Sequence, residues 1–255
     1  MAQSNSRSPR RMHFEHPALA KKSISTDKPP EDSISWRLWT QSNDLAEQAL
    51  ASDYVQGIKN GTLHPDAYGG YTVQDAAYCF NARADYETVE RRATADGDAE
   101  LADFAKARAD SYASYNESFC KQWHLKGGDA VIPAAAAQTY IDFEHHVAHG
   151  LSPIYGVVAM IPCDELWSWL ATELKPFAGD GNLYGFWIED NDDWHGAYRL
   201  DNFIDDWFAA HPDVYDWDTA LYVMRSCMTC EVNFFRSAGG QDLLPMPSKP
   251  SALSG

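Results

Sequence analysis

The sequence predicts an all-α protein, built as one helical bundle of about seven to nine helices. Apolar residues recur at steps of three and four along most of the chain, as they do on one face of an amphipathic helix. No segment shows the alternation of apolar and polar residues that is typical of a β-strand. The length of 255 residues fits one large domain better than two. We therefore expect a single helical domain over residues 33–237.

The apolar stripes and the residues between them place the expected helices along the chain. Ser33 and Ser35 are candidate N-caps of the first helix, and Asn60-Gly61 is a stop signal for it. Pro65 suits the first turn of the next helix, and Gly69-Gly70 allows a break before a long helical stretch. The expected helices cover residues 36–58, the stretch from 65 to about 95 with a break at Gly69-Gly70, and residues 97–125, 133–149, 152–175, 184–193, 197–209 and 214–236.

The charge of the chain limits its partners. The net charge is −17, and an acidic chain repels the phosphate backbone, so we expect no nucleic-acid partner. No apolar run is long enough for a transmembrane helix, so we expect no membrane partner either. Residues 1–30 are instead basic, with six Lys or Arg and two acids, and rich in serine. We expect residues 1–32 to be a disordered tail and residues 238–255 to be a loose C-terminal tail.

The cysteine count bears on the compartment. Five cysteines, an odd number, without a secretory signal indicate free thiols in a reducing compartment, which favours the cytoplasm. The basic, serine-rich residues 1–30 leave organelle targeting open as an alternative.

Two carboxylates interrupt apolar helix faces. Glu231 follows Met224 and Met228 on the stripe of the last helix, and burial of a carboxylate is costly unless it is paired. It is either a structural group capped by a Tyr or Trp donor, or an acid with a raised pKa that moves protons. Asp75 lies between Tyr71 and Tyr78 on one helix face. It either joins two helices through a tyrosine, or accepts an amino donor of a flat ring that stacks on the tyrosines.

Three further patterns involve thiols or imidazoles. Cys163 follows Pro162, whose helix-bending effect could turn the thiol towards a cavity, although buried cysteines are commonly inert. The Cys227–Cys230 pair has the CxxC spacing but lies inside a helical stripe, which favours packing over metal or redox chemistry. His145 and His149 have the spacing of a zinc-binding helix, yet His146 stands at the position of the general-base glutamate. No third ligand is evident, so this pattern disfavours a zinc hydrolase.

Several blocks together resemble the TenA family, the thiaminase II-like proteins. They fall in the family's order over roughly residues 36–237, and Cys163 after Pro162 is typical of the cysteine-bearing branch. The blocks are Val55-Gln56-Gly57-Ile58-Lys59-Asn60-Gly61-Thr62-Leu63-His64-Pro65, Tyr71-Thr72-Val73-Gln74-Asp75-Ala76-Ala77-Tyr78, Tyr140, Ala159-Met160-Ile161-Pro162-Cys163, Trp187-Ile188 and Glu231-Val232-Asn233-Phe234-Phe235.

The resemblance implies a heme-oxygenase-like bundle that assembles as a homotetramer. It implies hydrolysis of aminopyrimidines in thiamin salvage, with 4-amino-5-aminomethyl-2-methylpyrimidine as the typical substrate, thiamin as another, and no cofactor. By position, Cys163 matches the nucleophile and Glu231 the catalytic carboxylate. Asp75 matches the acid that holds the pyrimidine, and Tyr78 and Tyr140 match tyrosines of the pocket.

Two positions depart from the family pattern. Trp167 and Asn191 stand where the family often has pocket tyrosines, which puts the identity of the substrate in doubt more than the chemistry. The rival interpretations are a ligand-binding protein of the same fold without turnover, and a cofactor-free or di-iron oxidase of the PqqC type. A heme oxygenase is disfavoured, because residues 36–58 contain no His to serve as a proximal ligand.

Overall fold

The computed structural model describes residues 24–124 and 126–250, which form an all-α fold with no strand in these ranges. Two short 3-10 helices, Gly128–Ala130 and Lys175–Phe177, accompany the α-helices. The α-helices are α1 (Ile34–Thr40), α2 (Asn43–Leu50), α3 (Asp53–Lys59), α4 (Pro65–Asp96), α5 (Ala99–Gln122), α6 (Ala135–Gly150), α7 (Pro153–Ala159), α8 (Ile161–Leu174), α9 (Gly185–Asn191), α10 (His195–Ala210) and α11 (Trp217–Ala238). The all-α prediction is confirmed.

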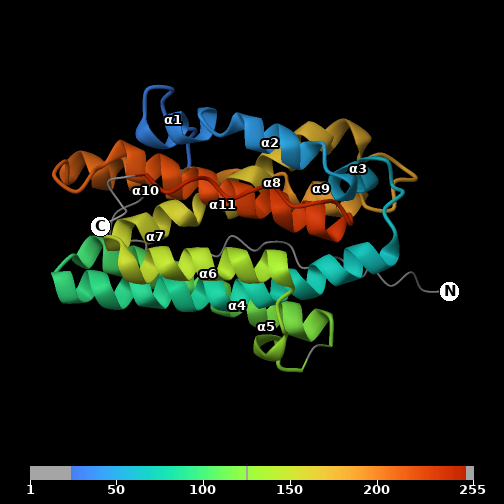
Figure 1. Ribbon diagram of the computed structural model, residues 1–255, viewed down its shortest axis with the longest axis horizontal. Helices are drawn as coiled ribbons and strands as arrows, with labels where there is room; N and C mark the ends of the chain where they lie inside the picture. Colours follow the sequence, from blue (N-terminus) through green and yellow to red (C-terminus); the bar gives the residue numbers. More distant parts are fainter. Residues whose placement is uncertain (1–23, 125, 251–255) are drawn as a thin grey trace.

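The helices form two layers with α11 near the middle. In Figure 1, α4, α5 and α6 form the lower layer, and α1 to α3 lie along the top. The last helix, α11, contacts α6 and α4 on one side and α1, α2, α3 and α8 on the other. Because helices pack against α11 from both sides, all ten residues from Ser226 to Phe235 are buried rather than one stripe alone.

Two expected helices are divided in the structure, and one expected break is absent. Residues 36–58 form three short helices, because the hydroxyl of Ser42 bonds the Leu38 carbonyl and Ser52 caps a new helix by accepting from the Val55 amide. Residues 152–175 divide at Met160, where Pro162 begins the next helix. The glycines at 69 and 70, in contrast, lie within the continuous helix α4.

Both segments that flank the bundle contact it within the described residues. Asn202 donates to the backbone carbonyls of Ser25 and Asp27, and Lys28 lies over the Trp36 ring. The side chain of Asn233 on α11 exchanges two hydrogen bonds with the backbone of Leu244. The described part of the expected C-terminal tail is therefore extended and anchored to α11, whereas residues 1–23 and 251–255 lie outside the description.

No helix in the described ranges is long and apolar enough to span a membrane.

Candidate active site

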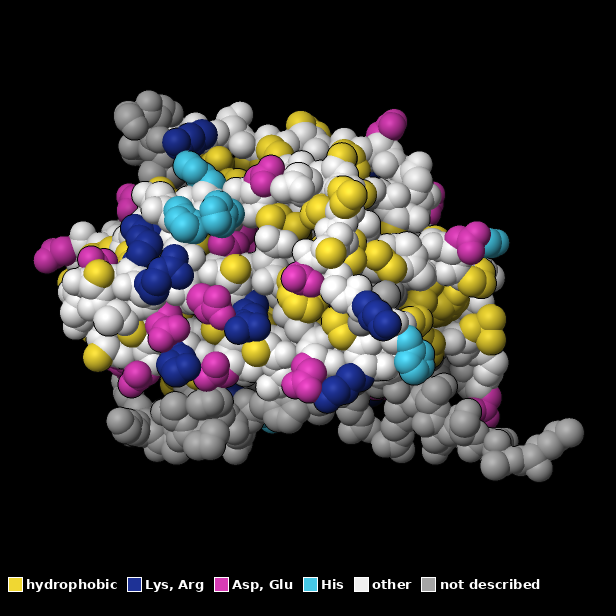
Figure 2. All heavy atoms as spheres, turned by 90° about the horizontal axis from the view of Figure 1, so that it is seen from below, with side chains coloured by type: hydrophobic (Ala, Val, Ile, Leu, Met, Phe, Trp, Pro, Cys, Tyr) yellow, Lys and Arg dark blue, Asp and Glu magenta, His cyan; other side chains and the backbone are white. Residues whose placement is uncertain are grey.

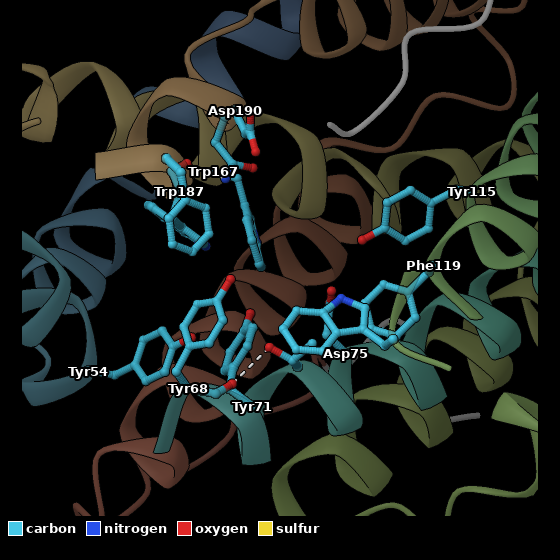
Figure 3. A pocket seen from close by; sticks show the side chains of 13 residues that line it. Tyr54, Tyr68, Tyr71, Asp75, Tyr115, Phe119, Trp167, Trp187 and Asp190 are labelled. Carbon is cyan, nitrogen blue, oxygen red and sulfur yellow. Dashed lines mark hydrogen bonds between the residues drawn. The ribbon is translucent and has the colours of Figure 1, made fainter. Parts of the chain in front are cut away.

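An aromatic cavity opens between α4, α5, α8 and α9 (Figure 3). Its volume is about 510 Å³, counting the open mouth. Nine of the thirteen residues that line it are aromatic, and the polar ones are Thr72, Asp75, Asp190 and Asn191. Stacked rings bind flat apolar faces, and carboxylates accept hydrogen bonds from amino groups. The cavity therefore suits a small aromatic molecule that carries amino donors.

Asp75 is held at this cavity by the tyrosine-rich face of α4. Its side chain is 7% exposed, and Figure 3 places it beside Tyr71 at one end of the cavity. Tyr71 stacks on Tyr54 at 4.7 Å between ring centroids and lies parallel to Phe235 at 5.5 Å. This packing fixes the face of α4 that presents Asp75, as the sequence pattern predicted.

Glu231 lies at a junction of three helices and is almost fully buried. The Tyr140 hydroxyl on α6 donates to its Oε1 at 3.2 Å, and the Trp167 Nε1 on α8 donates to its Oε2 at 3.3 Å. Hydrogen bonds of this kind offset the cost of burying a carboxyl group. Glu231 therefore has one donor of each of the two types, Tyr and Trp, that the structural alternative required, and its part in proton transfer stays a prediction.

Cys163 occupies the first turn of α8, directly after Pro162. Its Sγ lies 3.6 Å from the Tyr112 hydroxyl on α5, and the residue is 1% exposed. Cys163 and Trp167 are four residues apart, so their side chains leave α8 on the same face. Trp167 therefore lies on the same face of α8 as the thiol, bonds the Glu231 carboxyl and lines the cavity.

Tyr78 lies three residues after Asp75 on α4, does not line the cavity and bonds a second buried carboxyl group. Its ring stacks on that of Tyr140 at 4.6 Å, and its hydroxyl donates to Glu144 Oε1 at 3.0 Å. Burial raises the pKa of Glu144 well above its ordinary value, and the nearby Asp85 charge raises it further. Sequence reasoning missed this role of Glu144, although its position four residues after Tyr140 places both on one face of α6.

The predicted site residues divide into two groups in the structure. Asp75, Trp167 and Asn191 line the cavity. Cys163, Glu231, Tyr78 and Tyr140 do not line it; they form the buried layer that Trp167 joins to it.

Asn191 is buried at the cavity wall, and its Nδ2 donates to the Trp187 carbonyl at 2.7 Å. The neighbouring Asp190 also lines the cavity, and Figure 3 shows it at the end away from Asp75. Sequence reasoning missed Asp190, since an acidic run at the end of a helix reads as a solvent-exposed surface.

Sequence comparisons connect the chain with thiamine biosynthesis proteins. No protein-family model matches the chain. It is 23% identical over 175 residues, 69% of its length, to the thiamine biosynthesis multifunctional protein ThiED of Corynebacterium glutamicum. It is 26% identical over 163 residues, 63% of its length, to the protein of that name in Corynebacterium efficiens. The chain spans only 22% of the length of each of these relatives.

Solved structures of TenA proteins share the fold. A TenA homologue from P. horikoshii OT3 superimposes with a TM-score of 0.68 at 20% identity, over 82% of this chain and 99% of that one. A protein described as a TenA family transcription regulator from Silicibacter sp. TM1040 gives 0.67 at 17% identity, over 82% and 98%. A TenA homologue from Pyrococcus furiosus gives 0.65 at 15% identity, over 80% and 99%. The chain thus shares the all-helical fold of these TenA proteins.

Proposed function

We propose that the chain is an aminopyrimidine aminohydrolase of the thiaminase II type, which acts in the salvage of the thiamin pyrimidine. The observation that carries the proposal is the junction at Trp167. Its ring forms part of an aromatic cavity that holds Asp75, and its indole N–H bonds the Glu231 carboxyl. Cys163 leaves the same face of α8 one turn earlier. Similarity to thiamine biosynthesis proteins supports the same class of substrate.

In the proposed reaction, Asp75 accepts hydrogen bonds from the amino group and ring nitrogen of the pyrimidine and orients it. The Cys163 thiolate adds to the ring carbon adjacent to the substituted one while a ring nitrogen gains a proton. The exocyclic methylene then expels its amine, which leaves protonated. Water adds to the methylene, the thiolate departs and the aromatic ring is restored. Glu231 is the group that delivers and collects these protons.

The layered arrangement assigns a task to Trp167 in this reaction. Asp75 lines the cavity but the thiol and the carboxyl do not, so a pyrimidine held by Asp75 meets them only if the rings of Tyr71 and Trp167 move apart. These two rings lie 5.8 Å apart between centroids. A shift of the indole would open this route and would also change the hydrogen bond to Glu231.

The test is an assay of the purified full chain with 4-amino-5-aminomethyl-2-methylpyrimidine and with thiamin. Mass detection of the hydroxymethyl pyrimidine and release of ammonia are the readouts. We expect turnover that Cys163→Ser lowers by several orders of magnitude, because a hydroxyl is a far weaker nucleophile than a thiolate. Cys120→Ser is the matched control and keeps the activity. Equal rates in the two variants would remove Cys163 from the mechanism.

The position of Cys163 and Glu231 behind the cavity wall also favours a second candidate, a pyrimidine-binding protein without turnover. In that case aminopyrimidines bind, Asp75→Asn weakens the binding, and no product forms with any compound of the panel. Calorimetry and the product assay on the same samples distinguish the two functions.

A further inference from the structure

The histidine pattern on α6 acquires a third partner in the folded protein. His145 and His149 are four residues apart on α6, and Asp85 comes from α4, which packs against α6. Each of the three residues offers one possible ligand atom, and these three atoms lie within 4.8 Å of one another. The missing ligand of the sequence motif is therefore supplied by a residue 60 positions earlier in the chain.

Asp85 differs from an ordinary surface acid. It is 1% exposed, and its Oδ1 lies 3.0 Å from His145 Nδ1. Its Oδ2 is buried and has no hydrogen-bond partner. A buried carboxylate oxygen without a donor is costly, and a metal cation bound beside it would offset that cost.

The two imidazoles lie at the surface above Asp85, where an ion can reach them. The rings of His145 and His149 lie 4.0 Å apart between centroids, and both residues are exposed. Figure 2 shows histidine side chains grouped on the face that α4, α5 and α6 form, with basic side chains nearby. Arg91 donates to Thr88 Oγ1, which also lies 3.4 Å from His149 Nε2, and Arg92 donates to the Ala148 carbonyl.

We propose that Asp85, His145 and His149 form a binding site for a divalent transition-metal ion of the Zn²⁺ type. Two imidazoles and one carboxylate are a ligand set that Zn²⁺ accepts, with water at the fourth position. Ligands at about 2.1 Å from a tetrahedral ion lie roughly 3.3 Å from one another, and rotation of the exposed imidazoles closes the remaining gap. None of the three residues lines the aromatic cavity.

The experiment is a calorimetric titration with Zn²⁺ of the full chain after treatment with a chelator. His149→Ala removes one exposed ligand, and His146→Ala removes an exposed imidazole of the same helix that is outside the site. We expect one ion per chain in the wild type, at least tenfold weaker binding in His149→Ala, and unchanged binding in His146→Ala. Binding to cysteines or to other histidines is common to all of these proteins and cancels in the comparison.

Asp85→Asn provides a second arm, checked for folding by circular dichroism because Asp85 is buried. A folded Asp85→Asn protein should also lose at least tenfold in affinity. With Co²⁺ as the probe, the visible absorption of a nitrogen- and oxygen-coordinated ion should be present in the wild type and in His146→Ala and absent from His149→Ala. Equal Zn²⁺ affinity in the wild type and His149→Ala, or no binding in the wild type, would overturn the proposal.

Discussion

Buried carboxyl groups lie on two sides of α8 and differ in the residues that surround them. On one side, Glu231 receives hydrogen bonds from Tyr140 and from Trp167, which is itself part of the cavity wall. On the other side, Glu165 of α8 and Asp201 of α10 are each 1% exposed. The Oε2 of Glu165 and both carboxyl oxygens of Asp201 have no hydrogen-bond partner.

Glu165 and Asp201 show that burial of an acidic residue does not by itself indicate a catalytic role. Burial and the nearby Asp201 charge raise the pKa of Glu165 well above its ordinary value. Burial and the Asp205 charge do the same for Asp201. Neither residue lines the cavity. A buried acid becomes a candidate for catalysis only where donors orient it and a ligand can approach it.

The largest expected effect separates the two groups by rate. Glu231→Gln keeps the shape of the side chain but cannot transfer a proton, so we expect kcat to fall about 100- to 10,000-fold with little change in ligand binding. Glu165→Gln, the matched control on the other side of α8, should leave kcat within about twofold. Steady-state kinetics with the best aminopyrimidine substrate is the measurement. A weaker affinity with an intact kcat in Glu231→Gln would make Glu231 a binding residue.

The second prediction concerns how stability depends on pH. A raised pKa means that folded Glu165 retains a proton that the unfolded chain loses above its ordinary pKa of 4.5. The wild type therefore loses stability as the pH rises above this value, by about 1.4 kcal/mol for each pKa unit of the shift. Glu165→Gln removes this contribution. The difference in unfolding free energy between variant and wild type should move in favour of the variant as the pH rises.

Urea denaturation of both proteins at pH 4, 5.5 and 7 measures this difference. Asp110→Asn, on an exposed ion pair of α5, is the control, and should show no comparable trend in favour of the variant. A difference for Glu165→Gln that is constant over the three pH values would contradict the assigned protonation.

The third prediction tests the link between cavity and carboxyl. Trp167→Phe keeps an aromatic ring at the wall but removes the donor to Glu231 Oε2, and a hydrogen bond to a charged group contributes about 1.5–3 kcal/mol. We expect a decrease in kcat of roughly tenfold or more. Trp187→Phe, a ring change in the same cavity, should act mainly on KM. If both variants change only KM, the Trp167 bond does not serve the chemistry.

The sequence predicted which polar residues are buried better than it predicted which of them face the cavity. Helical spacing was sufficient to identify Glu231 and Asp75, because each interrupts an apolar stripe that has to face the core. It did not identify Glu165, because the burial of this residue depends on the packing of α10 against α8. Whether a buried residue faces a cavity depends on how helices far apart in the sequence pack, as the pairing of Asp85 with α6 also shows.

The smallest expected effect concerns Asn191, which the structure places at the cavity wall rather than in solvent. Its amide is bonded to the Trp187 carbonyl within α9, so it acts on the cavity mainly through its small volume. Asn191→Tyr would place a ring in this space and restore the residue type that the family often has there. We expect the added ring to lower kcat/KM less for the small pyrimidine than for the larger thiamin. The ratio of the two kcat/KM values should change by up to about tenfold, or 1.4 kcal/mol of differential binding. Glu189→Gln, on the exposed side of the same helix, is the control and should leave the ratio unchanged. An unchanged ratio in Asn191→Tyr would show that this wall does not select the substrate, and that selection lies deeper, at Trp167 and the carboxyl it holds.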